Sequence, residues 1–187
     1  MSSLLIPTAF IIALILILVF WGIGMQNKLV QTDELCGNAM SQIGVQQATR
    51  WDAMSAMVDL TKSYSDHEYR ALTDIIKSRR SIGFQSHATD ANAQEGMLGQ
   101  VLSRIAVLAE AYPELKANTV YIKTMDSLRG YEDNVRMSRM VYNDTVTKYN
   151  RLIRAFPGSI IAGFLSFAVR DYLQEDPAKS AMPSMLR

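Results

Sequence analysis

The sequence contains little of what disulfide scaffolds, metal clusters and β-rich folds are built from. Its 187 residues include one cysteine, five prolines and ten glycines, and 19 basic residues nearly balance 18 acidic ones. A single cysteine excludes an intrachain disulfide and a thiolate cluster, and with them the zinc-finger and iron–sulfur classes. The net charge of +1 provides no basic field for nucleic acid. Few helix breakers and few aromatic residues instead favour long helices.

An uncharged apolar stretch lies near the N-terminus, over residues 4–25. A helix of this length, at roughly 1.5 Å per residue, crosses a hydrocarbon core of about 30 Å. Trp21 lies near its end, where an indole favours the headgroup zone. The alternative is a secretory signal, with Gly22-Ile23-Gly24 as a weak cleavage site. We favour an uncleaved transmembrane helix, because no Lys or Arg precedes the run and the run is longer than a usual signal core.

The charges that flank this stretch predict its orientation. Residues 1–8 carry no Lys or Arg, whereas Lys28 follows the stretch. By the positive-inside rule we expect a single-pass protein of the inner membrane, with its N-terminus outside and its helical domain in the cytoplasm.

Apolar periodicity predicts four helices after the span, at about residues 27–82, 90–112, 119–156 and 159–174. Within 119–156 the apolar seam advances by alternate steps of three and four residues, which is the heptad pattern of a coiled coil. The predicted fold class is therefore all-α. We expect an N-terminal segment with a transmembrane helix over residues 1–26, an up-and-down four-helix bundle with long coiled-coil-like helices over residues 27–176, and a flexible tail over residues 177–187.

Several segments resemble the LemA family of bacterial single-pass membrane proteins. They are Asn27-Lys28-Leu29-Val30, Tyr64-Ser65-Asp66-His67-Glu68, Tyr112-Pro113-Glu114-Leu115-Lys116-Ala117-Asn118, Tyr142-Asn143-Asp144, Tyr149-Asn150 and Phe156-Pro157. The resemblance implies a short extracytoplasmic N-terminus, one membrane helix and a cytoplasmic four-helix bundle. It implies no reaction, catalytic residue or cofactor, and relatives in magnetosome membranes are tied to membrane invagination.

The sequence departs from the family pattern within the first predicted helix. Residues 52–57 lack the helix-kinking proline that the family favours there. We therefore expect no sharp bend at residues 53–57.

Two charged residues, Glu132 and Arg139, occupy positions in the heptad seam. A charge without a partner there is strongly destabilising. Arg139 has no acidic residue one turn away on its own helix, so we expect it to pair across the bundle. The hypothesis is that Glu132 and Arg139, with charged groups of the first helix, fix the register of the bundle; Tyr142 is a third polar candidate in the seam.

Two further clusters are candidate interaction sites. Lys77, Arg79 and Arg80 form a compact basic group that could meet phosphate, anionic lipid or an acidic partner, although cations at a helix end also complement the helix dipole. The apolar run over residues 160–169 could lie on a membrane, dock a partner or pack in the core. We favour core packing, because up-and-down order of the predicted helices places this run far from the bilayer. Its interface candidates are Ile160, Phe164 and Phe167.

The residues that could carry chemistry do not form a recognisable site. His67-Glu68 lacks the second imidazole of a zinc-protease motif, since Ala71 stands three residues beyond Glu68. His87 lies in a predicted turn, and Cys36 has no histidine near it in sequence to activate it. We predict no enzyme, no catalytic or metal-binding residue and no cofactor.

These observations predict a non-enzymatic, membrane-anchored interaction or scaffold protein that self-assembles. Its expected partners are the lipid bilayer, further copies of itself through the long seam, and other membrane proteins, but no nucleic acid. Two alternatives stay open: an oligomeric membrane-shaping protein, and a regulatory or sensor subunit of a membrane protease or signalling system.

Overall fold

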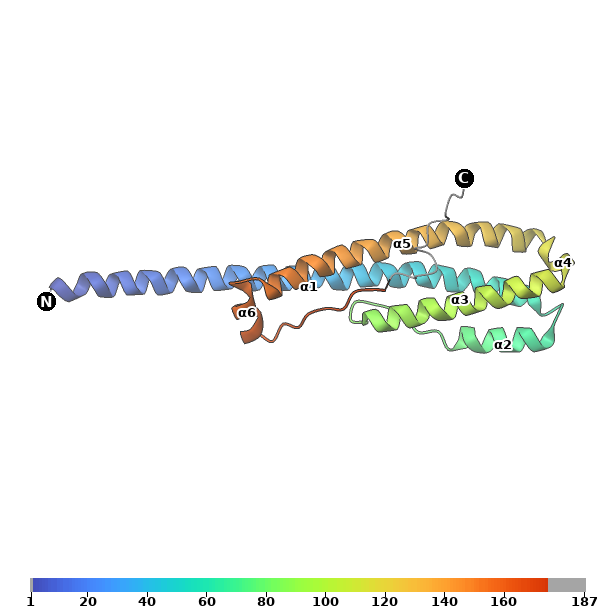
Figure 1. The fold of residues 1–187 in the computed structure, drawn as a ribbon, viewed down its shortest axis with the longest axis horizontal. Coiled ribbons are helices and arrows are strands. Elements are labelled where there is room, and N and C mark those ends of the chain that lie inside the picture. The colour runs from blue at the N-terminus through green and yellow to red at the C-terminus, as the bar shows by residue number, and fades with distance from the viewer. Residues whose placement is uncertain (1, 175–187) are drawn as a thin grey trace, which may run out of the picture. The chain divides into compact units, whose positions relative to one another are not determined.

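The computed structural model describes residues 2–174, with side chains from Thr8 onward, and every regular element within this range is a helix (Figure 1). The helices are α1 (Ser2–Thr61), α2 (Asp66–Lys77), α3 (Ala88–Ala111), α4 (Pro113–Lys116), α5 (Thr119–Arg154) and α6 (Gly158–Phe164). The predicted all-α class is confirmed. The predicted tail over residues 177–187 lies outside the described residues.

The contacts divide the chain into two compact units. Among the described residues, 2–36 and 144–170 form one, which we name the anchor unit. Residues 37–143 and 171–174 form the other, which we name the bundle unit. Helices α1 and α5 contribute residues to both units.

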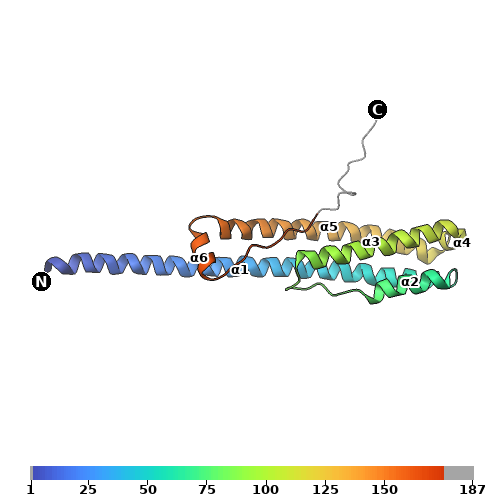
Figure 2. The same ribbon diagram turned by 60° about the horizontal axis from the view of Figure 1, so that its bottom comes forward.

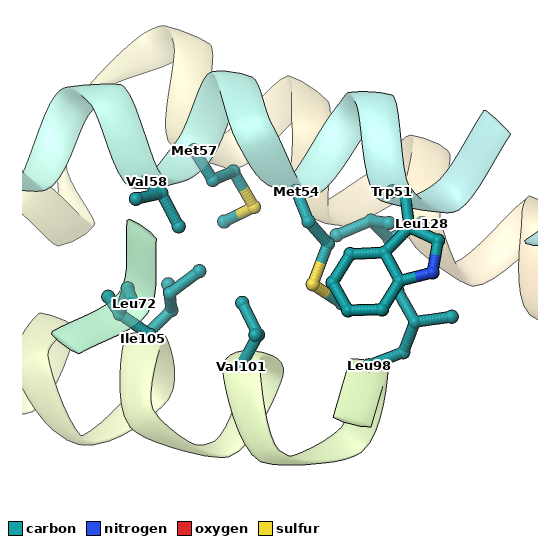
Figure 3. Packing of buried hydrophobic residues seen from close by; sticks show 9 residues of the cluster. All are labelled: Trp51, Met54, Met57, Val58, Leu72, Leu98, Val101, Ile105 and Leu128. Carbon is teal, nitrogen blue, oxygen red and sulfur yellow. The ribbon is translucent and has the colours of Figure 1, made fainter. Parts of the chain in front are cut away.

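In the bundle unit, α1, α2, α3 and α5 surround one apolar core, in which side chains from the four helices meet (Figure 3). Consecutive long helices run in opposite directions in both ribbon views (Figures 1 and 2), as an up-and-down bundle requires. Fully burying one such side chain contributes roughly 1.5–3 kcal/mol. The buried members of the cluster are Trp51, Met54, Met57, Val58, Leu72, Leu98, Val101, Ile105 and Leu128.

The predicted first helix, residues 27–82, is wrong beyond residue 61. α1 is continuous through residues 53–57, but it ends at Thr61, and α2 begins at Asp66. The Ser65 hydroxyl caps α2 by accepting the N–H of Glu68 at 3.4 Å, and two acidic residues in the first turn complement the helix dipole. α2 is therefore the fourth helix of the bundle, in place of the predicted helix at 159–174.

The connection from α2 to α3 passes very close to α1 at Gly44. A Cβ atom on Gly44 would lie 1.9 Å from the backbone oxygen of Ile82. No side chain fits at that distance, so glycine allows the connection to lie against the helix. The same connection is held to α3, because the Arg80 N–H donates to the Gln94 side-chain oxygen at 3.0 Å.

The anchor unit contains the apolar part of α1. Every α1 side chain from Thr8 to Trp21 is exposed. Among the described residues, α1 is the one helix long and apolar enough to cross a membrane, by length and composition alone. A signal sequence near an N-terminus meets the same criterion.

The predicted helix at 159–174 is wrong beyond residue 164. α6 ends at Phe164, Ser166 takes a positive φ of 59°, and residues 167–174 have no regular secondary structure. A left-handed residue commonly terminates a helix. We name residues 167–174 the strap.

The α6 region also lies elsewhere than expected. In both ribbon views α6 is beside α1 (Figures 1 and 2). A Cβ atom on Gly22 would lie 3.7 Å from Ile161 Cδ1, so α6 packs at the end of the apolar stretch. The expectation that this run is far from that stretch is wrong, because α2 adds a reversal of chain direction that the predicted helices lack.

Candidate functional site

The bundle unit buries one arginine among three helices. Arg50 of α1 is 2% exposed. Its Nη1 lies 2.7 and 2.8 Å from the two carboxylate oxygens of Glu95 on α3, and its Nη2 lies 3.5 Å from Glu132 Oε1 on α5. Both glutamates keep part of their surface in solvent. The arrangement joins α1, α3 and α5 through charge, since an arginine this deep needs such partners.

Gln47 extends this polar layer by one turn of α1. Its amide nitrogen donates to the Ala91 carbonyl at 3.0 Å and to Glu95 Oε2 at 3.5 Å. Three buried atoms of the layer have no hydrogen-bond partner among the described residues: Gln47 Oε1, Arg50 Nε and Trp51 Nε1. Burying these atoms in an apolar core without hydrogen bonds is unfavourable to the free energy of folding.

The three predicted seam residues all bond to other parts of the bundle unit. Glu132 contacts Arg50 of α1, as described above, whereas Arg139 donates to Asn92 Oδ1 on α3 at 3.0 Å and to the Gln174 carbonyl of the strap. Arg139 therefore pairs across the bundle, but with α3 and the strap and not with α1. The Tyr142 hydroxyl donates to the Asp171 carbonyl at 3.1 Å. That these contacts fix the register stays a prediction.

An asparagine side chain holds the strap in the bundle unit. Asn143 Nδ2 donates to the Leu173 carbonyl at 3.1 Å, and Asn143 Oδ1 accepts the Leu173 N–H at 2.9 Å. This amide therefore satisfies both backbone groups of one strap residue. Sequence reasoning missed this role, although Asn143 belongs to a Tyr-Asn pair that recurs seven residues later on the same helix.

The anchor unit contains the second Tyr-Asn pair, whose asparagine also bonds both backbone groups of one strap residue. Asn150 Nδ2 donates to the Arg170 carbonyl at 2.9 Å, and Asn150 Oδ1 accepts the Arg170 N–H at 3.0 Å. The Arg170 Nε lies 2.7 Å from Asp33 Oδ1 of α1, and its guanidinium lies 5.9 Å from the centre of the Tyr149 ring. Backbone pairing and an ion pair thus fasten the chain that follows α6 to both α1 and α5.

Burial raises the pKa of two groups in the anchor unit. Desolvation is the main cause that raises the pKa of the Cys36 thiol to about 11, with Asp33 adding to the effect and Arg170 opposing it. Desolvation also raises the pKa of Tyr149 to about 12, assisted by the charge of Asp33 and a hydrogen bond with it. Cys36 is fully buried. Its thiol stays protonated near neutral pH and packs as a small apolar side chain, as predicted.

The predicted basic group does not form one patch of free charge. Arg79 Nη1 lies 3.0 Å from Asp52 Oδ1, in an exposed ion pair with α1. Lys77 lies in the last turn of α2, where its charge complements the dipole, and the backbone of Arg80 is bonded to α3. All three side chains are exposed.

The predicted interface candidates differ in exposure. Ile160 is 62% exposed and Phe164 is 87% exposed, whereas Phe167 is half-buried. Core packing, the interpretation favoured for this run, is therefore wrong for Ile160 and Phe164. In the run, Ala162 is the residue that is buried.

Neither histidine lies in a buried site. His67 is exposed in the first turn of α2. His87 is exposed at the N-cap of α3, where its backbone N–H donates to Asp90 Oδ2 at 3.0 Å. Across residues 2–174, no group of three or more His, Cys, Asp or Glu is arranged to hold a metal ion.

The heptad seam of α5 is largely buried inside the chain, so it offers little free surface for self-association. Its buried members are Leu128, Val135, Tyr142, Val146 and Tyr149. A different strip of α5 is exposed: Met137, Met140 and Val141 are each at least half exposed. Their i, i+3 and i+4 spacing places them on one face of the helix. We name these three residues the α5 strip.

Comparison with known proteins links the chain to a family. The sequence model of the LemA family matches residues 39–185. The chain is 32% identical over 84 residues to magnetosome protein MamQ 1 of Paramagnetospirillum magneticum, over 45% of this chain and 31% of that protein. It is 24% identical over 154 residues to protein LemA of Metamycoplasma hominis, over 82% of this chain and 70% of that protein. The match thus spans about a third of the magnetosome protein.

Proposed function

Because the chain belongs to the LemA family, we propose that it is a membrane-anchored helical scaffold that binds proteins, further copies of itself included, and catalyses no reaction. The observation that carries the proposal is the exposed apolar surface of α1 from Thr8 to Trp21. Apolar surface of this extent is unfavourable in water and favourable in a lipid bilayer. The same helix supplies side chains to the bundle core, so one element serves as both anchor and scaffold.

Packing at the end of the apolar stretch supports an anchor that is retained. Gly22 faces Ile161, and a Cβ atom on Gly158 would lie 3.5 Å from the Met25 sulfur. Cleavage after Gly22-Ile23-Gly24 would remove part of this packing. We propose an inner-membrane location with the N-terminus outside and the bundle in the cytoplasm, on the basis of Lys28 and the uncharged N-terminus.

The α5 strip supports binding to a second protein surface. Its two methionines have flexible, polarisable side chains that adapt to irregular apolar partners. The buried seam contributes to the fold of one chain, so we assign self-association to the strip and not to the seam.

The candidate nucleophile Cys36 and the candidate base His87 both have structural environments that support a role without catalysis. The Cys36 thiol is buried, and its raised pKa disfavours the thiolate that a nucleophile requires. His87 serves as the N-cap residue of α3.

The test measures the mass of the full-length protein in a mild detergent, together with any co-purifying protein. We expect an oligomer that Met140→Lys shifts toward monomer. Val107→Lys is the matched control, because Val107 is an exposed apolar residue of α3 at 69% exposure. A wild-type protein that stays monomeric at micromolar concentration and captures no protein would overturn the proposal. Very large assemblies would favour membrane shaping, and one stoichiometric enzyme would favour a regulatory subunit.

A further inference from the structure

The α6 region exposes apolar side chains at the level where the apolar stretch of α1 ends. Gly22 faces Ile161, and Met25 faces Gly158, so α6 lies against the last turn of that stretch. Figures 1 and 2 show α6 beside α1 at this point. If α1 crosses a bilayer, this level is the boundary between acyl chains and headgroups.

The exposed side chains there are large and close together in the chain. Phe156 is 80% exposed in the turn before α6, and Ile160 and Phe164 are exposed one helical turn apart within α6. Leu165, just after α6, is also exposed. An aqueous surface rarely gathers two phenylalanines and an isoleucine of this exposure in nine residues without a partner.

The basic residues of the segment that carries these side chains favour binding to an anionic membrane surface. Residues 145–170 contain four basic residues and no acidic residue. Arg170 is paired with Asp33, while Lys148, Arg151 and Arg154 are exposed on the last turns of α5. Apolar side chains combined with Lys and Arg are typical of segments that lie in a membrane interface.

We propose that the α6 tip, defined as Phe156, Ile160, Phe164 and Leu165, is a second membrane contact that inserts into the interface of the leaflet that α1 leaves. The inserted side chains lie among the upper acyl chains, while Lys148, Arg151 and Arg154 meet lipid phosphates. The inference rests on the membrane anchor of the proposed function. The helix that carries the tip packs beside Gly22, whose neighbours Trp21 and Ile23 are exposed apolar residues, and this favours lipid over a second copy of the chain as the occupant.

The experiment places an environment-sensitive fluorophore on single cysteines of the full-length protein in vesicles of phosphatidylcholine and phosphatidylglycerol. Cys36→Ala provides the background, Phe164→Cys reports the tip, and Leu165→Cys repeats the measurement if Phe164→Cys fails to fold. Ile15→Cys reports the anchor. Val107→Cys is the control, because it lies on an exposed face of the bundle unit.

We expect lipids with a nitroxide near the headgroup to quench the probe at residue 164, and aqueous iodide to leave it nearly unquenched. The probe at Val107→Cys shows the reverse. Removing phosphatidylglycerol, or combining Arg151→Gln with Arg154→Gln, reduces the lipid quenching at 164.

Three other outcomes each overturn the inference, and together they separate it from the proposed function. Quenching by deep nitroxide lipids at Ile15→Cys without any lipid quenching at 164 removes the tip contact and leaves the anchor. If neither probe is quenched by lipid, the anchor fails as well. A probe at 164 that resists iodide only at high protein density, and is never quenched by lipid, identifies a second copy as the occupant.

Discussion

The ion pair between the buried Arg50 and Glu95 predicts unequal losses of stability when one partner or the other is replaced. Arg50 is 2% exposed, whereas the Glu95 side chain is 21% exposed and that of Glu132 is 33% exposed. Replacing Glu95 leaves a cation in the core with one carboxylate at 3.5 Å, and replacing Arg50 leaves two carboxylates that reach water. Breaking a buried pair costs about 3–5 kcal/mol when the remaining charge cannot be hydrated.

We therefore expect Glu95→Met to destabilise the protein by about 3 kcal/mol, since Glu132 still compensates part of the charge. Arg50→Met removes the arginine together with its desolvation penalty and costs about 1 kcal/mol. The double variant resembles Arg50→Met alone. At about 2–4 °C per kcal/mol for a chain of this size, Glu95→Met lowers the melting temperature by roughly 6–12 °C, and Arg50→Met by roughly 2–4 °C.

The assay is thermal unfolding followed by circular dichroism in one detergent at one scan rate. Asp126→Asn is the control, because its ion pair with Arg129 is exposed at both ends and contributes at most about 1 kcal/mol. Equal losses for the two single variants, or a larger loss for Arg50→Met, would refute the argument from unequal hydration.

Four further outcomes follow from the structure. Gly44→Ala forces its new methyl group against the Ile82 carbonyl and destabilises the fold by about 1–3 kcal/mol, measured by thermal unfolding with Gly24→Ala as the unhindered control. Asn150→Ala removes both hydrogen bonds to Arg170, so trypsin cleaves after Arg170 several times faster than in the wild type; an unchanged rate contradicts the role of the amide. With its pKa at about 11, Cys36 is about one-thousandth thiolate at pH 8 and reacts with a thiol reagent far more slowly before unfolding than after. Burial of the protonated Cys36 thiol contributes stability below the ordinary pKa of 9.0, and this contribution is lost as pH rises toward 11. A free energy of unfolding that rises over this pH range contradicts the burial of the thiol.

Helix content was predictable because the apolar spacing of α3 and α5 is regular and because proline or capping residues mark the ends of these helices. The turn between α1 and α2 was missed, since residues 62–65 contain neither Gly nor Pro and apolar side chains continue on both sides. Ser65 and Glu68 have the spacing of a capping box, which is the local signal that could have found it.

The polar contacts were only partly predictable. Glu132 was recognisable because it interrupts an apolar seam, whereas Arg50 was not, since arginine on a long helix usually reaches solvent. The strap was missed for a different reason. Its residues were predicted to continue the helix after residue 159, whereas their conformation depends on asparagines distant in sequence.

The way in which the asparagines hold the strap affects how this segment can vary. Both amides bind peptide groups, which every residue except proline offers in full. The identity of the exposed residue Gln174 is therefore free to change over evolution, as long as the peptide groups of the bonded residues are kept. Proline at position 170 or 173 would remove the N–H that the paired asparagine requires, so we expect selection to exclude proline there while it tolerates wide variation at neighbouring exposed positions.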